Sequence, residues 1–253
     1  MNTSESSNYR GIALSSVYGK LFDNIVLKRY SAKLMTYELQ FGFKARSSTN
    51  MCTMVLKEAI AYYSKNQSSV FCTFLDASKA FDRVRYCKLF DLLIKRNLPA
   101  CIIRVLVNFY TSNYVRVSWC GVISDYFHAL NGVKQGDVLS PVLFCIYIDI
   151  LLVALAKAGV GCFIGKNFVG ALAYADDIVL LAPSPTALHK MLQICDEFAT
   201  DYSIVFNAQK SKCLVIFPQR CRFLTDRLNA CTFYIGCDRI EFVESFSHLG
   251  SYY

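Results

Sequence analysis

Three aspartates lie where an unpaired carboxylate would be costly. Asp76 directly follows the apolar run VFCTFL, and Asp176 with Asp177 divides two apolar runs in FVGALAYADDIVLLAP, residues 168–183. Carboxylates are rarely found among apolar residues unless a partner or a metal ion compensates their charge. Because carboxylate oxygens are the ligands that Mg²⁺ prefers, the three residues predict a divalent-cation site.

Such a site requires the carboxylates to meet at the ends of neighbouring strands. In the middle of one strand, Asp176 and Asp177 would point to opposite faces. If ALAY and IVLL pair as a hairpin with Ala175 and Asp176 in the turn, both carboxylates can lie at one end of a sheet, where Asp76 also ends its strand. The residues alone leave a plainer alternative open, a polar turn at 176–177 and a capping Asp76, because aspartate is an ordinary turn residue.

The elements that must position these residues follow from hydrophobic periodicity and turn signals. Ser140 suits the N-cap and Pro141 the first turn of a long buried helix. The expected helices cover residues 12–34, 51–60, 86–96, 99–110, 141–158 and 185–202, and the expected strands cover 70–75, 171–174, 178–181, 213–217, 232–235 and 240–243, with a hairpin between 114–119 and 126–130. Their mixed order, without regular βαβ units, predicts an α+β fold.

Composition narrows the class of protein. The 253 residues are 54% hydrophobic, which is ample for a globular core. An excess of 27 Lys and Arg over 19 Asp and Glu gives a net charge of +8, which favours an anionic partner. We therefore expect a globular protein with an anionic partner.

Three other classes of protein are disfavoured. The twelve cysteines are scattered singly in apolar runs without a signal peptide, so we expect reduced cysteines and an intracellular location, in cytoplasm and nucleus. No CxxC pair or suitably spaced histidine predicts a structural zinc. The apolar segment Pro141–Ala158 carries Asp149 near its middle, which indicates a buried helix and not a membrane span.

The chain resembles a known family from about Tyr9 to Tyr253: the reverse transcriptase domain of non-LTR (LINE-type) retrotransposons. The matching segments, in the family's order, are NYRGIALSSVYGKLFDNIVLKR, QFGFKARSSTN, FCTFLDASKAFDRV, GVKQGDVLSPVLFCIYID, YADD, FNAQKSKCLVIF and FSHLGSYY. One such segment would be a weak signal, but seven in register are specific.

The resemblance implies a chemistry for the carboxylates. Asp76, Asp176 and Asp177 would bind two Mg²⁺ ions, with Mn²⁺ as an alternative, and Asp76 and Asp176 would be the direct ligands. One ion would lower the pKa of the primer 3′-hydroxyl, and the other would neutralise the triphosphate. Lys210 falls where the family's lysine can protonate pyrophosphate, although its neighbour Lys212 could be mistaken for it.

The resemblance also implies nucleotide contacts. Phe81 would lie under the sugar of the incoming nucleotide, where a 2′-hydroxyl would collide with it, so that dNTP is selected. Gln135 and Gly136 would approach the template and the nucleotide. The plainer alternatives are a core phenylalanine and a simple turn before a helix.

Two further pairs complete the implied substrate contacts. Lys44 and Arg46, on a basic loop containing glycine, would contact the triphosphate, although either could be an ordinary surface charge. Leu249 and Gly250 resemble the turn that grips the primer end.

The implied architecture is the fingers and palm of a right-handed polymerase, with an antiparallel palm sheet backed by helices. Fingers would comprise about 9–70 and 87–130, palm about 71–86 and 131–245, and a primer-grip-like end 246–253; we expect the helical thumb to be missing. The implied partners are an RNA template, a DNA primer and dNTP, without a membrane, and the oligomeric state stays open.

Two competing hypotheses come from other classes of protein. A catalytically silent retroelement remnant would at most bind nucleic acid through its basic fingers. The intact carboxylates argue against decay of the site, whereas the expected lack of a thumb argues against efficient turnover. A nucleotide cyclase, which shares a palm-like sheet, would not account for the fingers motifs or for GVKQGDVLSP.

Overall fold

Strand β1 (Val70–Leu75) is buried along its whole length between two antiparallel neighbours, β9 (Asp177–Ala182) and β10 (Lys212–Ile216). This arrangement comes from a computed structural model of the protein, which describes residues 9, 11–218 and 231–253. The chain forms two units, residues 1–35 with 81–144 and residues 36–80 with 145–253, which are described separately below. The predicted division into fingers and palm stays a prediction.

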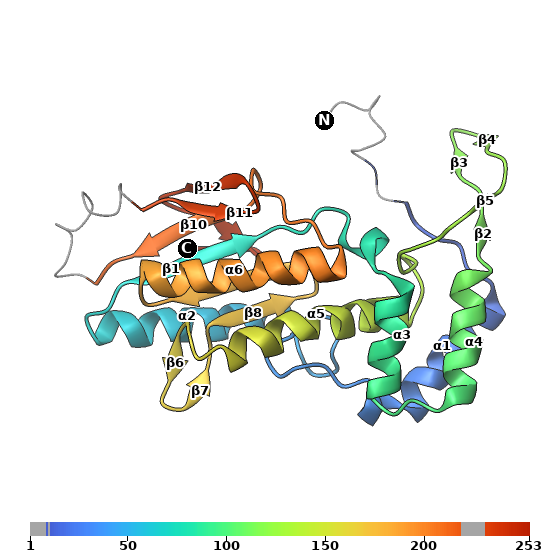
Figure 1. The fold of residues 1–253 in the computed structure, drawn as a ribbon, viewed down its shortest axis with the longest axis horizontal. Coiled ribbons are helices and arrows are strands. Elements are labelled where there is room, and N and C mark those ends of the chain that lie inside the picture. Colours follow the sequence, from blue (N-terminus) through green and yellow to red (C-terminus); the bar gives the residue numbers. More distant parts are fainter. Residues whose placement is uncertain (1–8, 10, 219–230) are drawn as a thin grey trace. The chain divides into compact units, whose positions relative to one another are not determined.

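The second unit is built on a six-stranded sheet (Figure 1) in the order β11-β12-β10-β1-β9-β8. Its remaining strands are β8 (Ala171–Tyr174), β11 (Phe233–Ile235) and β12 (Asp238–Phe242). All neighbouring strands are antiparallel except β10 and β12, which are parallel. The predicted strands and the α+β class are thereby confirmed.

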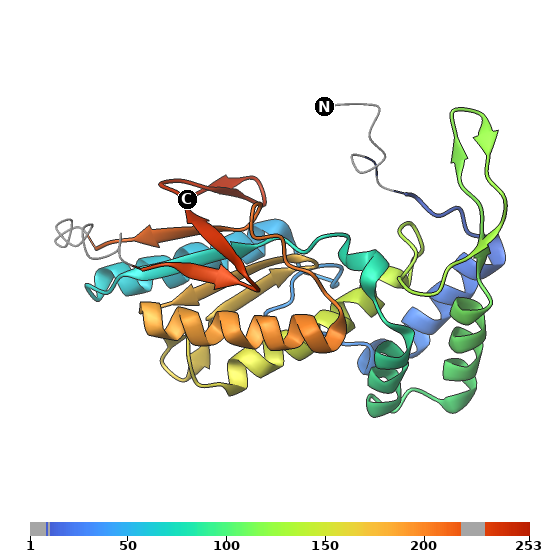
Figure 2. The ribbon, with the colours of Figure 1, turned by 45° about the horizontal axis from the view of Figure 1, so that its top comes forward.

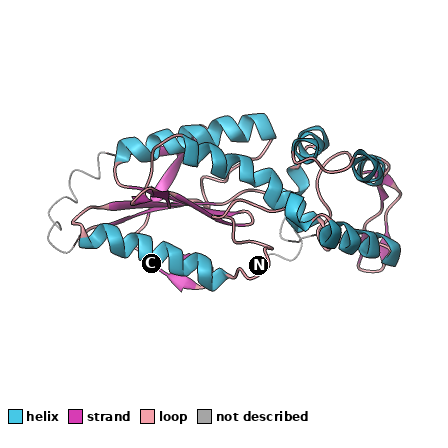
Figure 3. Cartoon of the chain, turned by 90° about the horizontal axis from the view of Figure 1, so that it is seen from below, coloured by secondary structure: helices cyan, strands magenta, loops and turns pink. Residues whose placement is uncertain are grey.

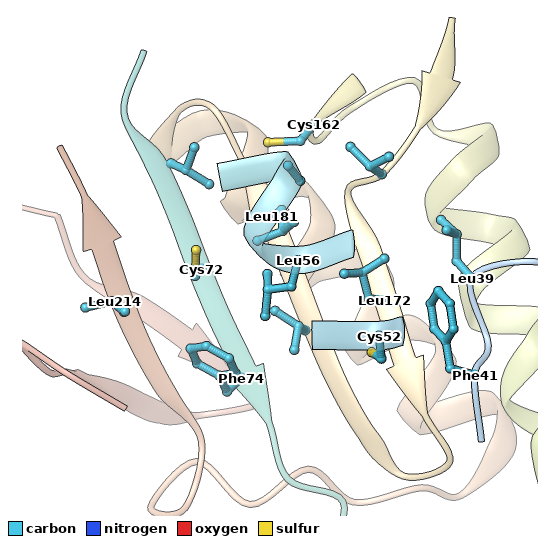
Figure 4. Close-up of a cluster of buried hydrophobic side chains, with 14 residues drawn as sticks. Leu39, Phe41, Cys52, Leu56, Cys72, Phe74, Cys162, Leu172, Leu181 and Leu214 are labelled. Carbon is cyan, nitrogen blue, oxygen red and sulfur yellow. The ribbon is translucent and has the colours of Figure 1, made fainter. Parts of the chain in front are cut away.

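Helices cover both faces of this sheet, as its edge-on view in Figure 3 shows. On one face, Cys52 and Leu56 of α2 (Thr49–Lys65) lie over Cys72 and Leu172 of the sheet (Figure 4). On the other face, α6 (Pro185–Tyr202) places His189 against Phe233. Two covered faces explain why β1 is buried at every position and not only at alternate ones.

Helix α5 (Ser140–Lys157) is the long buried helix that the sequence predicts. By length and composition alone it is the one helix in the described part of the chain that could cross a membrane. Its residues 143–148, 151 and 152 are fully buried, and Asp149 accepts a hydrogen bond from the backbone N–H of Tyr37 at 3.0 Å. The structure therefore uses α5 as a core helix.

Among its described residues, the first unit contains three α-helices besides the start of α5: α1 (Val17–Arg29), α3 (Tyr86–Lys95) and α4 (Ala100–Thr111). Helices α3 and α4 lie side by side, and a long hairpin follows α4 (Figure 2). Its strands are β2 (Tyr114–Val115), β3 (Ser118–Trp119), β4 (Val122–Ile123) and β5 (Phe127–His128). The predicted hairpin is confirmed.

Two 3-10 helices and two small hairpins complete the description of these residues. The 3-10 helices are η2 (Ser31–Lys33) and η3 (Ala80–Arg83), and the small hairpins are β6 (Phe163–Ile164) with β7 (Asn167–Phe168) and β13 (Ser247–His248) with β14 (Ser251–Tyr252). The hairpin β6–β7 lies in a segment for which the sequence predicted no strand.

Several predicted helix boundaries were wrong: the first helix ends at Arg29 and not at residue 34, and α2 covers Thr49–Lys65 and not residues 51–60. The first helix begins at Val17 and not at residue 12, because Ser16 is the N-cap and its hydroxyl accepts the backbone N–H of Gly19 at 3.1 Å. A serine that satisfies an otherwise unpaired N–H in the first turn is a helix start signal. The apolar residues before it, Ile12 and Leu14, are exposed and add no helical turn.

Candidate active site

Asp76 is held at the end of β1 by its own backbone. Its N–H donates to the hydroxyl of Ser211 at 3.1 Å, and its carbonyl accepts the N–H of Asn207 at 2.8 Å. Ser211 is fully buried, whereas the Asp76 side chain is only partly buried. The backbone is thus fixed while the carboxylate stays accessible to a ligand.

Asp176 lies in the tight turn that the sequence predicts. Strand β8 ends at Tyr174, which pairs with Asp177 at the start of β9, so Ala175 and Asp176 form a two-residue hairpin loop. Ala175 has a φ of 59°, in the left-handed region that hairpin turns of this length demand and that glycine usually occupies. Asp176 is partly buried and Asp177 is exposed.

Strand register brings the three aspartates to one end of the sheet. Leu75 is paired with Ile178, so the next residue of one strand, Asp76, continues toward the position of Asp177 on the other. Neighbouring strands lie about 4.8 Å apart, which puts Asp76 beside the β8–β9 turn. The predicted meeting of carboxylates at strand ends is therefore what the backbone produces.

Two cysteine thiols near the turn stay protonated. Burial, and after it the charge of Asp177, raises the pKa of the Cys52 thiol to about 12. Burial, followed by the charges of Asp149 and Asp176, also raises the pKa of Cys145. A protonated thiol is a poor metal ligand, so these two cysteines do not compete with the aspartates for a cation.

The three aspartates suit a hard cation whose remaining ligands are water molecules and substrate phosphates. Among the described residues, no three or more His, Cys, Asp or Glu side chains form a ready-made metal cluster. Mg²⁺ is commonly held by one or two carboxylates together with waters and substrate phosphates, so a closed protein cage is not required. Asp76 and Asp176, with Asp177 beside them, have the chemistry for this open type of site.

Lys44 and Arg46, the two predicted phosphate contacts on the loop before α2, have different surroundings. The ammonium of Lys44 donates to the carbonyls of Tyr37 at 3.0 Å and Thr36 at 3.4 Å. Arg46 is exposed and has a φ of 63°. Since Lys44 already binds backbone oxygens, Arg46 is the more accessible cation of the pair.

The structure also distinguishes Lys210 from Lys212, the two lysines that could be confused as the residue that protonates pyrophosphate. The ammonium of Lys212 forms an ion pair with Glu241 at 2.7 Å and donates to the carbonyl of Gln209 at 2.6 Å. Lys210 is exposed, and its backbone N–H donates to the side-chain oxygen of Asn207 at 3.2 Å. The ammonium of Lys212 is therefore bound by Glu241 and Gln209, which favours Lys210 as the predicted proton donor to pyrophosphate.

The predicted primer-grip residues form a hairpin turn. Leu249 and Gly250 connect β13 to β14 and have φ values of 48° and 77°. Such a pair of left-handed residues is the conformation of a type I′ turn. Leu249 packs against the core cluster under α2.

Phe81, Gln135 and Gly136 belong to the first unit, so their distance from the carboxylates stays a prediction. The ring of Phe81 stacks on Phe144, with centroids 4.4 Å apart. The carbonyl of Gln135 accepts the N–H of Ala13 at 2.7 Å, and a Cβ on Gly136 would lie 3.0 Å from the Ala13 carbonyl. The absence of a side chain at Gly136 thus allows another backbone segment, here that of Ala13, to approach closely.

Sequence reasoning missed two residues that hold this site. Ser211 accepts the N–H of Asp76, and the fully buried Gln40 makes hydrogen bonds to the Ala175 backbone. Ser211 stands in a polar stretch that resembles an ordinary loop, and Gln40 stands before a glycine-containing loop. Nothing in single-sequence patterning marks a serine or glutamine as buried, so the structure was needed to find them.

Comparison with known proteins adds independent information. The family model described as "Reverse transcriptase (RNA-dependent DNA polymerase)" matches residues 2–243. A Pol polyprotein of the retrotransposable element R2DM from Drosophila melanogaster is 28% identical over 233 residues, which are 92% of this chain and 22% of that protein. A probable RNA-directed DNA polymerase from the transposon X-element of the same species is 33% identical over 150 residues, 56% of this chain and 16% of that protein.

Solved structures show the same fold at low sequence identity. The telomerase of Candida tropicalis, determined with a fragment of telomeric RNA, aligns with a TM-score of 0.59 and 13% identity, covering 79% of this chain and 34% of that one. This likeness concerns the fold alone. The chain spans about a fifth of the length of the curated relatives it matches, 22% and 21% for the first two.

Proposed function

Because the chain belongs to the reverse transcriptase (RNA-dependent DNA polymerase) family, we propose that it adds deoxynucleotides to a DNA primer on an RNA template. Its relatives include the R2, X-element and jockey elements, which agrees with the predicted non-LTR retrotransposon class. The observation that carries the proposal is the register of β1 with β9, which brings Asp76 to the Ala175–Asp176 turn.

In this proposal the carboxylates of Asp76 and Asp176 hold Mg²⁺, and Asp177 adds negative charge beside them. The bound metal would make the primer hydroxyl a better nucleophile and offset the charge of the triphosphate. The protein's own contribution is to present the carboxylates on rigid backbone. Ser211 and Asn207 hold Asp76, and the hairpin turn holds Asp176.

The remaining residues would orient the substrates. Arg46 would contact the triphosphate, because Lys44 is bound by backbone carbonyls. Lys210 would protonate the pyrophosphate as it leaves, and Phe81 would exclude the 2′-hydroxyl from the sugar site. Gln135 with Gly136 would meet the template, and the Leu249–Gly250 turn would meet the primer.

The competing function is nucleic-acid binding without catalysis. A net charge of +8 would favour either function, so charge does not separate them. Three aspartates converging at one strand end favour catalysis, since a mere binding surface gains nothing from negative charge beside phosphates.

The test is primer extension with oligo(dT) annealed to poly(rA), in Mg²⁺, with a poly(dA) template as comparison. The wild-type chain should extend the primer on RNA, and Asp76→Asn and Asp176→Asn should not. Asp201→Asn, on the exposed side of α6, is the matched control and should extend normally. Binding of the primer–template without any extension by the wild type would support the silent alternative and overturn this proposal.

A further inference from the structure

Gln40 is a buried polar side chain with an unusual position. It is fully buried, in the loop segment that precedes α2, between Leu39 and Phe41, whose side chains belong to the core cluster (Figure 4). A buried amide must find hydrogen-bond partners, because leaving its donors or acceptors unpaired is costly. The Gln40 side chain forms its hydrogen bonds with the backbone of Gly42 and of Ala175, which precedes Asp176 in the β8–β9 turn.

The amide oxygen of Gln40 accepts two backbone N–H groups. The N–H of Gly42 and the N–H of Ala175 both lie 2.9 Å from it. Two backbone donors can converge only on an acceptor, so the atom between them must be the oxygen. The amide nitrogen then faces the carbonyl of Ala175, at 3.4 Å. Gln40 therefore contacts the Ala175 peptide groups on both sides.

Backbone hydrogen bonds on either side of Gln40 hold its loop against β8, beside Ala175. The N–H of Phe41 donates to the carbonyl of Ala173 at 2.8 Å, and the N–H of Ala173 donates to the carbonyl of Leu39 at 2.9 Å. These bonds form a parallel bridge along the edge of β8. The loop thereby extends the edge of the sheet, and the Gln40 side chain reaches past the strand end to the turn.

Gly42 lets the loop backbone approach Ala175 closely. A Cβ on Gly42 would lie 2.4 Å from the Ala175 nitrogen, closer than any side chain could stand. Ala175 itself holds a φ of 59°, which alanine disfavours and keeps only where its surroundings impose it. The two-residue hairpin loop requires this φ, and the hydrogen bonds of Gln40 hold the same residue in it.

We propose that Gln40 is a positioning residue for the cation site: its amide fixes Ala175 in the left-handed conformation and so sets where the adjacent Asp176 presents its carboxylate. This inference rests on the proposed function, because it takes Asp176 to be a ligand of the catalytic cation. A glutamine that merely fastened the loop to the sheet would leave cation affinity unchanged when replaced.

The test replaces Gln40 with methionine, which is similar in length and makes none of these hydrogen bonds. Gln193→Met, on the exposed face of α6 where the amide donates to Glu197 at 3.0 Å, is the matched control. In metal-free protein, amide hydrogen exchange measured by NMR should be at least about tenfold faster at Ala175 in Gln40→Met, with core amides of β1 and β9 unchanged.

Cation affinity supplies the decisive readout. Titration with Mn²⁺, followed by electron paramagnetic resonance, should give a dissociation constant at least about fivefold higher for Gln40→Met than for the wild type or Gln193→Met. The half-saturating Mg²⁺ concentration in primer extension should rise similarly, while the rate at saturating Mg²⁺ recovers toward the wild-type rate. If Gln40→Met does not fold, Gln40→Asn, whose amide is one methylene short, takes its place.

A double variant separates positioning from fastening. Glycine adopts a positive φ without strain, so Ala175→Gly should make the turn less dependent on Gln40. Gln40→Met should then raise the Mn²⁺ dissociation constant less in the Ala175→Gly background than in the wild type. An equal increase in both backgrounds would contradict the proposed route through Ala175.

The outcomes distinguish this inference from the proposed function. Wild-type extension with unaltered Mn²⁺ and Mg²⁺ dependence in Gln40→Met overturns the inference and leaves the function standing. A wild type that binds Mn²⁺ but never extends a primer overturns the function, and weaker binding in Gln40→Met then still supports the inference. If the wild type binds no Mn²⁺, both are overturned.

Discussion

Acid should destabilise the protein through His248, which lies in the carboxyl-terminal hairpin. Its side chain is 7% exposed and its ring lies beside Phe74, with centroids 5.0 Å apart. Within the described residues, Nε2 has no hydrogen-bond partner. Burial without a partner disfavours the charged ring and lowers the pKa of His248 from 6.5 to about 4.

The sign follows from which state binds the proton first. As the pH falls below 6.5, the unfolded chain protonates His248 while the folded protein does not. Stability is therefore fully present above pH 6.5 and is lost as the pH falls toward about 4. A shift of this size corresponds to about 3 kcal/mol over the whole window, of which about 2 kcal/mol is lost between pH 7 and pH 5.

Urea unfolding at pH 7 and pH 5 measures this loss. His248→Leu keeps an apolar side chain in the same place and removes the titration, while the other histidines titrate alike in both proteins. The wild-type free energy of unfolding should fall by about 2 kcal/mol more than that of His248→Leu. Equal falls in the two proteins, or an NMR titration of His248 near its ordinary pKa in the folded state, would refute the reasoning.

Two further predictions concern a close contact and the sugar site. Gly42→Ala should lower the free energy of unfolding by about 1–3 kcal/mol, because its Cβ would meet the Ala175 nitrogen at 2.4 Å, whereas Gly11→Ala, with nothing within 4 Å, should be nearly neutral in the same urea assay. Phe81→Val should raise incorporation of ribonucleotides relative to deoxyribonucleotides in primer extension, because an opened sugar site discriminates against one added hydroxyl only within about a hundredfold. An unchanged ratio in a folded, active variant would make Phe81 only the stacking partner of Phe144.

The strands around the site could be predicted because local rules decide them. Residues 70–75 are mostly apolar and are rich in β-branched and aromatic side chains, and β1 has those bounds. The two-residue turn at Ala175–Asp176 followed from the alternation of side chains along a strand. Helix α6 follows from a serine N-cap and a proline in the first turn, and it begins and ends where predicted, at Pro185 and Tyr202.

What could not be predicted depends on contacts between distant segments. Gln40 and Ala175 are 135 residues apart, as are Asp76 and Ser211, and no local pattern encodes either hydrogen bond. The parallel pairing of β10 with β12 is likewise a matter of tertiary packing. The start of α1 was predicted too early because apolar spacing continued before Ser16, and the cap decided the boundary.

Single-nucleotide incorporation by rapid quench tests the central claim most directly. Protein bound to an oligo(dT)–poly(rA) primer–template is mixed with dTTP and Mg²⁺, so that the rate reports one addition and not dissociation. The wild type should show a rate that saturates with Mg²⁺, and Asp76→Asn should be slower by at least about 10³-fold, equivalent to about 4 kcal/mol of transition-state stabilisation. Asp76→Asn that folds normally and adds the nucleotide at the wild-type rate would contradict the assignment of this strand end as the catalytic centre.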